Sequence, residues 1–310
     1  MAVNMKGKSL ASLYDLTGEE IEQILKTSEL LKLQLLRRQG HPILKGKTLA
    51  MIFEKPSTRT RVSFEVGMWQ LGGYALYLSA TDLQLGRGET IADTAQVLSR
   101  YVDGMMARVF RHQTILDLVK YSRVPVVNGL SDYTHPCQGL ADLFTIYEKK
   151  GKLSGLKVAY VGDGNNVAHS LIFGCSKVGI NITLACPKGY EPNSEVVSRA
   201  KDGARKNGCK VKVTNDPKEA VKGADIVYTD VWASMGQEKE HEKRVKIFKP
   251  YQVNGQLVKK AKDDYLFMHC LPAHRGEEVT DEVADSKNSV IFDQAENRMH
   301  TQKALLALIM

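Results

Sequence analysis

Strand-like and helical segments alternate along the whole chain, and this alternation constrains its fold more than any other feature. The apolar runs with strand character lie at 48–53, 74–78, 104–109, 124–127, 156–161, 181–185, 211–214, 226–229 and 265–269. Helices that connect successive strands in this way join parallel strands, and a parallel sheet is normally covered by helices on both faces. The sequence therefore predicts an α/β protein with doubly wound parallel sheets.

The length of the chain predicts more than one domain. Its 310 residues exceed what one hydrophobic core usually holds, so we expect two domains of roughly 150 residues. A long helical pattern after Gln138 ends in the charged, glycine-bearing stretch 148–152, where we place the junction. The first domain is then expected at 1–147 and the second at 148–297.

Charge, cysteine content and apolar runs narrow the class of protein. The formal net charge of +8 comes from scattered lysines and arginines, which favours a small anionic substrate over nucleic acid. The five cysteines are odd in number, widely spaced and without a CxxC pair, which argues against a disulfide framework and a structural zinc site. We expect a cytoplasmic protein, since no apolar run reaches the ~18 residues of a membrane span and the first residues lack a signal-peptide core.

The stretch from Phe53 to Leu71, FEKPSTRTRVSFEVGMWQL, predicts a phosphate-binding corner between a strand and a helix. Ser57 is a suitable N-cap, and the free amides at a helix N-terminus attract anions. The arginines Arg59 and Arg61 add planar forks that suit phosphate oxygens. A capped surface helix with solvated arginines is the alternative, but five consecutive phosphate-binding residue types directly after a strand favour the site.

Further polar residues follow the predicted strand ends, where open α/β sheets bind ligands. Ser57, Arg108 and His135 lie at or after such ends in the first half of the chain. Asn166, Asp230 and Cys270 occupy them in the second half. The two sets are expected to face each other across an interdomain active-site cleft.

Two other stretches receive structural rather than functional interpretations. Gly162-x-Gly164 follows a strand, as in dinucleotide-binding sites, but the third glycine is replaced by Val167 and no ribose-binding acid follows the next strand. A tight turn in a doubly wound domain explains it better. The charged run at 238–244 is interpreted as a solvated helix face.

Four motifs in order identify a family resemblance: Ser57-Thr58-Arg59-Thr60-Arg61, His135-Pro136-x-Gln138, Asp230-Val-Trp-x-Ser234-Met235-Gly236, and His269-Cys270-Leu271-Pro272. The first two are shared by carbamoyltransferases generally, and the last two resemble the ornithine branch. Over nearly its whole length the chain is similar to the ornithine carbamoyltransferase family. The combination is specific, although each motif alone has a simpler explanation as a cap, a buried polar residue or core filler.

The resemblance implies transfer of a carbamoyl group from carbamoyl phosphate to the δ-amine of L-ornithine, giving L-citrulline and phosphate. It implies a carbamoyl-phosphate domain followed by an ornithine domain, with a C-terminal helix at about 298–310 returning to the first. It also implies homotrimers, sometimes assembled into dodecamers, with arginine biosynthesis more plausible than breakdown. No cofactor, metal, nucleic acid or membrane partner is implied.

The resemblance also assigns residues to the two substrates. Carbamoyl phosphate is assigned Ser57, Thr58, Arg59, Thr60, Gln84, Arg108, His135, Gln138 and Arg298, with Gln84 reaching toward a neighbouring subunit's site. Ornithine is assigned Asn166, Asp230, Ser234, Met235, Cys270 and Leu271. The catalytic residues implied are Arg108, His135, Asp230 and Cys270. A cysteine beside a carboxylate resists ionisation, so Cys270 is not interpreted as a covalent nucleophile.

Several alternative functions stay open from the sequence. An aspartate carbamoyltransferase would share the first half but needs basic residues in the second domain for another carboxylate. Putrescine or an N-acylated ornithine would change the contacts around Ser234 and Met235. A non-catalytic binding paralogue should have lost Arg59, Arg108 or His135, and all three are present.

Overall fold

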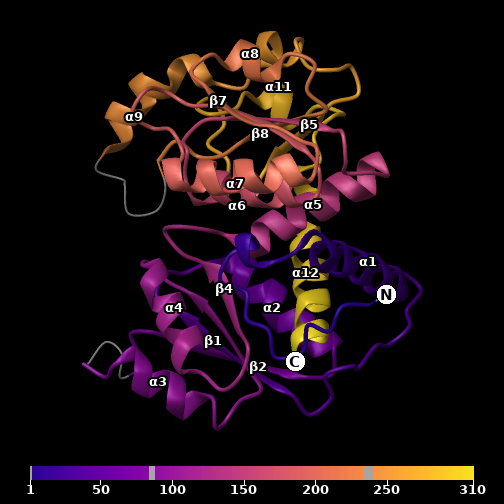
Figure 1. Cartoon of the computed structure of the whole chain (residues 1–310), viewed down its shortest axis with the longest axis vertical. Helices are drawn as coiled ribbons and strands as arrows, with labels where there is room; N and C mark the ends of the chain where they lie inside the picture. The colour runs from indigo at the N-terminus through magenta and orange to yellow at the C-terminus, as the bar shows by residue number, and fades with distance from the viewer. Residues whose placement is uncertain (1, 84–87, 234–239) are drawn as a thin grey trace. The chain divides into compact units, whose positions relative to one another are not determined.

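The structure, a computed structural model, describes residues 2–83, 88–233 and 240–310 (Figure 1). The chain divides into two compact units. One consists of Met1–Phe144 with Glu296–Met310, and the other consists of Thr145–Ala295. Two helices, α5 (Pro136–Lys150) and α12 (Ile291–Ile309), each contribute residues to both units.

The first unit contains a parallel sheet in the order β2-β1-β3-β4. Its strands are β1 (Thr48–Phe53), β2 (Tyr74–Ser79), β3 (Gly104–Arg108) and β4 (Val126–Leu130). Its own helices are α1 (Gly18–Leu36), α2 (Thr58–Gln70), α3 (Ile91–Leu98) and α4 (His112–Tyr121). Helices α3 and α4 pack on one face of the sheet, while α1, α2 and α12 lie on the other (Figure 1).

The second unit contains a parallel sheet in the order β7-β6-β5-β8-β9. Its strands are β5 (Lys157–Val161), β6 (Asn181–Ala185), β7 (Val211–Thr214), β8 (Ile226–Thr229) and β9 (Leu266–His269). Its own helices are α6 (Asn166–Lys177), α7 (Ser194–Lys206), α8 (Pro217–Val221), α9 (His241–Phe248), α10 (Gly255–Val258) and α11 (Asp281–Ala284). Helices α6 and α7 cover one face, and α8 and α11 lie over the other (Figure 1). Both units are therefore parallel α/β layers, as the alternation of segments predicts.

The strand orders locate the ligand-binding edge of each sheet. In an open α/β sheet, ligands bind beyond the carboxyl ends of the strands where the strand order reverses. The chain leaves β1 toward β2 on one side and reaches β3 on the other, so the reversal in the first unit lies between β1 and β3. The corresponding reversal in the second unit lies between β5 and β8. Residues after these strands are the ones expected to meet substrates.

Local signals explain most element boundaries. Thr17 and Glu20 form a reciprocal capping box that begins α1. The strand predicted at 124–127 instead begins after Pro125 and continues to Leu130, because proline has no N–H to contribute to the ladder. Helix α3 ends at Leu98, and residues 99–101 form a turn. Among the described residues, no helix is long and apolar enough to span a bilayer.

Candidate active site

The corner after β1 is held by Ser57 at the start of α2. Its Oγ accepts a hydrogen bond from the backbone N–H of Thr60 at 3.3 Å and donates one to the Thr60 Oγ1 at 3.1 Å. The side chain of Thr60 is fully buried, whereas Thr58 is exposed and Arg59 is half-buried. The first turn of the helix therefore presents backbone amides and side-chain donors beside the reversal between β1 and β3.

Arg298 of α12 connects this corner to α5. Its Nη2 donates to Thr60 Oγ1 at 3.1 Å, and its Nη1 donates to Gln138 Oε1 at 3.0 Å. Gln138 in turn donates from Nε2 to Asp142 at 2.8 Å, which fixes the orientation of its amide. Because Arg298 is only 3% exposed, water screens its charge poorly, and the charge interacts strongly with neighbouring groups.

His135 lies among three guanidinium groups. Burial first, and then Arg298, Arg108 and Arg59, lower the pKa of His135 well below its ordinary value. The imidazole is therefore neutral near pH 7, and it can donate a hydrogen bond without carrying a charge. The three positive charges that disfavour protonation of His135 also favour binding of an anionic ligand beside them.

Two basic residues near this corner differ from the sequence-based expectations. Arg61 does not join the group, because its guanidinium pairs with Glu65 at 3.1 Å and lies 3.9 Å from the ring centroid of Tyr77. Lys55 was not identified from the sequence, yet it is 9% exposed and its ammonium lies 4.5 Å from the Phe110 ring centroid. Burial and the nearby Arg108 charge lower the pKa of Lys55. Its position two residues after the end of β1 could have identified Lys55 as a candidate site residue.

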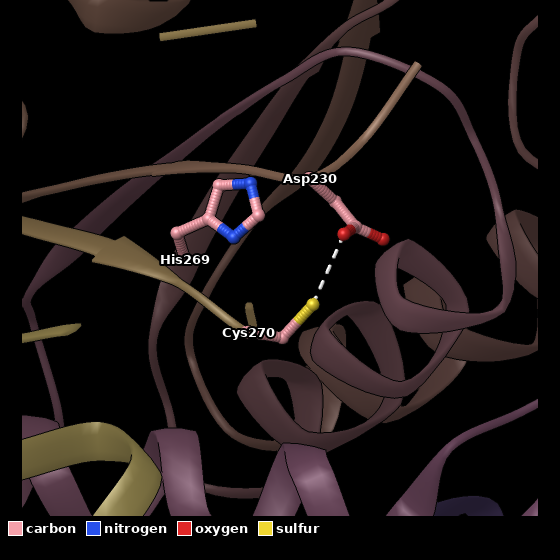
Figure 2. Close-up of side chains that lie close together, drawn as sticks. All are labelled: Asp230, His269 and Cys270. Carbon is pink, nitrogen blue, oxygen red and sulfur yellow. Dashed lines mark hydrogen bonds between the residues drawn. The ribbon is translucent and has the colours of Figure 1, made fainter. Parts of the chain in front are cut away.

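In the second unit, Asp230 collects three donors just beyond β8. The Nδ2 of Asn165 donates to its Oδ2 at 2.7 Å, and the Val231 N–H donates to its Oδ1 at 2.8 Å. The Cys270 thiol donates to the same Oδ1 at 3.0 Å, as Figure 2 shows. The carboxylate, which is 5% exposed, is thus held by residues following β5, β8 and β9.

Asn165, which was not identified from the sequence, makes two kinds of hydrogen bond. Its Oδ1 caps α6 by accepting from the N–H groups of Val167 and Ala168 at 3.0 and 3.1 Å. Its Nδ2 is then available for Asp230. Asn166, the residue expected at this site, is the first residue of α6 and is half-buried.

The end of β9 is organised by the buried pair His269 and Glu278. Nδ1 of His269 accepts from the Leu271 N–H at 2.9 Å, so the proton resides on Nε2 and faces Glu278 Oε1 at 3.2 Å. Leu271 has φ 58°, a left-handed conformation that a leucine adopts only where its surroundings require it. The pair therefore fixes the backbone next to Cys270.

Arg244 corrects the interpretation of 238–244 as a solvated helix face. The residue is 6% exposed, and its Nη1 donates to Asp163 at 3.0 Å and to the Trp232 carbonyl at 2.8 Å. Burial raises the pKa of Asp163 to about 6, and Arg244 opposes that rise. Three other expected site residues, Gln84, Ser234 and Met235, lie outside the described residues.

Comparisons with known proteins agree over the whole chain. Residues 8–148 match the family described as aspartate/ornithine carbamoyltransferase, carbamoyl-P binding domain. Residues 154–309 match the aspartate/ornithine carbamoyltransferase, Asp/Orn binding domain.

Individual relatives are similar at high identity. The ornithine carbamoyltransferase of Thermococcus kodakarensis is 63% identical over 310 residues, covering 100% of this chain and 98% of that protein. A Pyrococcus furiosus protein named ornithine carbamoyltransferase, anabolic, is 62% identical with the same coverage. The solved structure of the Pyrococcus furiosus ornithine carbamoyltransferase matches with a TM-score of 0.97 at 62% identity, covering 100% of this chain and 99% of that one. The chain therefore belongs to the aspartate/ornithine carbamoyltransferase family.

Proposed function

We propose that this enzyme transfers the carbamoyl group of carbamoyl phosphate to the δ-amine of L-ornithine, producing L-citrulline and phosphate. The observation that carries the proposal is the convergence of Arg59, Arg108 and Arg298 on a neutral His135 at the strand-end corner of the first unit. The high identity to proteins named ornithine carbamoyltransferase supports ornithine as the acceptor.

The first unit binds carbamoyl phosphate in this proposal. Ser57, Thr58, Arg59 and Thr60 hold the phosphate at the N-terminus of α2, where free amides favour negative charge. Arg108, His135, Gln138 and Arg298 surround the carbamoyl group and the bridging oxygen. Gln84 completes the set, supplied to a neighbouring subunit's site.

Catalysis follows from where negative charge develops. When an amine attacks the carbonyl, charge grows on the carbonyl oxygen and on the departing phosphate. Arg108, the neutral His135 and the Thr60 hydroxyl meet the first charge, while Arg59 and the helix N-terminus meet the second. Donors fixed in advance at such places usually contribute the largest share of the rate, about 3 kcal/mol for each donor removed.

The second unit has to present ornithine with a neutral δ-amine. An alkylamine has a pKa of about 10.4, so only about one molecule in 2,500 is neutral at pH 7. Asp230 and Cys270 act as a pair that binds the amino acid end and positions the δ-amine for attack. The Leu271 carbonyl accepts a hydrogen bond from that amine, and Asn166, Ser234 and Met235 hold the remainder of the substrate.

The assembly, location and pathway are parts of the same proposal. We propose a cytoplasmic homotrimer, or a dodecamer assembled from such trimers. The proposed domain bounds are 1–147 with about 298–310, and 148–297. A biosynthetic direction is supported by the word anabolic in the name of the Pyrococcus furiosus relative. Light scattering of the purified enzyme tests the assembly, since a monomer would contradict it.

Product analysis with competing acceptors tests the activity. The enzyme receives carbamoyl phosphate with ornithine, aspartate or putrescine, and the ureido products are quantified by mass spectrometry. We expect citrulline to form with kcat/KM at least a hundredfold above the other two, because a site with buried polar groups rejects ligands that leave them unpaired. Faster carbamoyl-aspartate or carbamoyl-putrescine formation would refute the assignment of ornithine.

A further inference from the structure

We propose that His241, His274 and Glu277 form a binding site for a borderline divalent cation of the zinc class, separate from the residues assigned to the two substrates. Each of these three side chains offers one ligand atom, and the three atoms lie within 4.8 Å of one another. His241 begins α9, and the other two belong to the turn at 274–279 that follows Cys270. The bound ion joins the start of α9 to that turn.

The distances suit coordination by one ion. Nε2 of His241 lies 3.1 Å from Glu277 Oε2, and Nδ1 of His274 lies 3.7 Å from the same oxygen. A tetrahedral ion with bonds of about 2.0–2.1 Å keeps its ligand atoms about 3.3 Å apart. Small side-chain rotations therefore close the site. A plain His–Glu hydrogen bond needs only two of these atoms and leaves the approach of the second imidazole unexplained.

The turn that carries two of the ligands is held before any ion arrives. Gln252 Nε2 donates to the carbonyls of Gly276 and Glu277, both at 2.8 Å. The Glu278 carboxylate accepts from the backbone N–H of His274 at 2.5 Å. Preorganised ligands lose less conformational entropy on binding, so three protein ligands suffice for a specific site.

The donor set selects the kind of metal. Two imidazoles and one carboxylate suit zinc, cobalt, nickel or copper, whereas calcium and magnesium prefer oxygen ligands alone. The side chains of His241, His274 and Glu277 are 40%, 46% and 29% exposed, so solvent can reach the ion and fill a fourth position with water.

The proposed ligand Glu277 is adjacent in sequence to Glu278, which contacts residues at the end of β9 near Cys270. Glu278, next to Glu277, holds both the His274 backbone and the buried His269. His269 in turn accepts from the Leu271 N–H. The site is thus connected to the backbone beside Cys270 through a short series of hydrogen bonds. A metal site at these residues departs from the expectation, drawn from the family resemblance, that the chain binds no metal.

A second set of possible ligands has to be separated in any test. Asp230, His269 and Cys270 also bring three ligand atoms within 4.8 Å, and they belong to the active site described above (Figure 2). Cobalt(II) distinguishes the two sets, because thiolate ligation produces a charge-transfer absorption that imidazole and carboxylate ligation lack. The cobalt(II) spectrum is therefore recorded on the native protein, and affinities are measured in the full-length Cys270→Ser protein, in which the competing thiol is removed.

Equilibrium dialysis with cobalt(II) and with zinc(II) measures the affinity of that protein. We expect one ion per chain and a rise in the thermal unfolding midpoint when the ion binds, and no thiolate absorption from cobalt(II) in the native protein. Since an outer-shell partner alone changes metal affinity about 10–100-fold, removing a direct ligand should weaken binding at least tenfold. His274→Ala and Glu277→Gln remove one ligand each.

Glu242→Gln is the matched control, because it removes the same charge from an exposed residue in the first turn of α9. Its affinity for the ion should equal that of the Cys270→Ser background. The proposal is overturned if the Cys270→Ser protein takes up no ion, or if His274→Ala and Glu277→Gln bind as tightly as Glu242→Gln.

Discussion

Asn165 offers the sharpest perturbation of the ornithine side, because its two hydrogen-bonding tasks can be separated. The Asn165→Asp substitution keeps an acceptor for the N–H groups of Val167 and Ala168, and aspartate is as good an N-cap as asparagine. It removes the Nδ2 donor that lies 2.7 Å from Asp230 and places a second carboxylate there. The helix should therefore persist while the Asp230 carboxylate loses its anchor.

The magnitude follows from the kind of hydrogen bond that is lost. A hydrogen bond to a charged group contributes about 1.5–3 kcal/mol, which corresponds to about 10–150-fold in a rate or binding constant. Repulsion between two carboxylates adds to this loss. We therefore expect kcat/KM for ornithine to fall by about 10–100-fold or more. Asn165→Ser, which keeps a cap but adds no charge, should fall near the lower end.

The assay measures citrulline formation under varied ornithine and, separately, carbamoyl phosphate binding by calorimetry. Carbamoyl phosphate affinity should stay unchanged, since every residue assigned to it belongs to the first unit or lies outside the described residues. Asn193→Asp is the matched control, because Asn193 caps α7 by accepting from the Glu195 N–H at 2.8 Å and is not assigned to either substrate. If Asn165→Asp uses ornithine as efficiently as Asn193→Asp, the assignment of Asn165 as the anchor of Asp230 is wrong.

Three further substitutions test other parts of the account. Arg298→Lys loses the planar fork that joins two buried partners, so the Kd for carbamoyl phosphate should rise about 100-fold in calorimetry, and an unchanged Kd would contradict this role. Burial lowers the pKa of Lys303 from 10.5 to about 8, so the unfolded state binds more protons between these values and stability rises with pH. Relative to Lys303→Met, the native protein should gain about 3 kcal/mol in free energy of unfolding from pH 8 to 10.5, whereas a constant difference in denaturant titrations would disprove the shift. Gly164→Ala places a Cβ 2.2 Å from the Pro192 nitrogen and should destabilise the protein by about 1–3 kcal/mol, while Gly40→Ala, with open space around it, should not.

The parts of the fold that depend on neighbouring residues could be predicted from the sequence. The capping box at Thr17 and the cap at Ser57 are local signals, and both helices begin where these residues place them. The alternation of strands and helices predicts parallel sheets in both units, because a right-handed crossover is almost the only way to connect such strands. Both ends of strand β1 were predicted correctly, because they coincide with the ends of a local apolar run.

Contacts between distant residues could not be derived from local patterns. Nothing in the sequence around Arg298 indicates that its two donors reach Thr60 and Gln138. The burial of Arg244 against Asp163 depends on how the chain returns to the sheet after Trp232, and a charged run normally predicts solvent exposure. The family resemblance supplied roles for several such residues where physical reasoning from the sequence did not.

Titration calorimetry with a bisubstrate analogue that carries phosphonoacetyl and ornithine parts tests whether the chain binds both substrates at once. If the chain holds carbamoyl phosphate and ornithine together for transfer, one analogue should bind per chain at least a hundredfold more tightly than phosphonoacetate or ornithine alone, because linking two ligands adds their binding free energies. Binding no tighter than that of the better fragment, or no heat at all, would contradict the account.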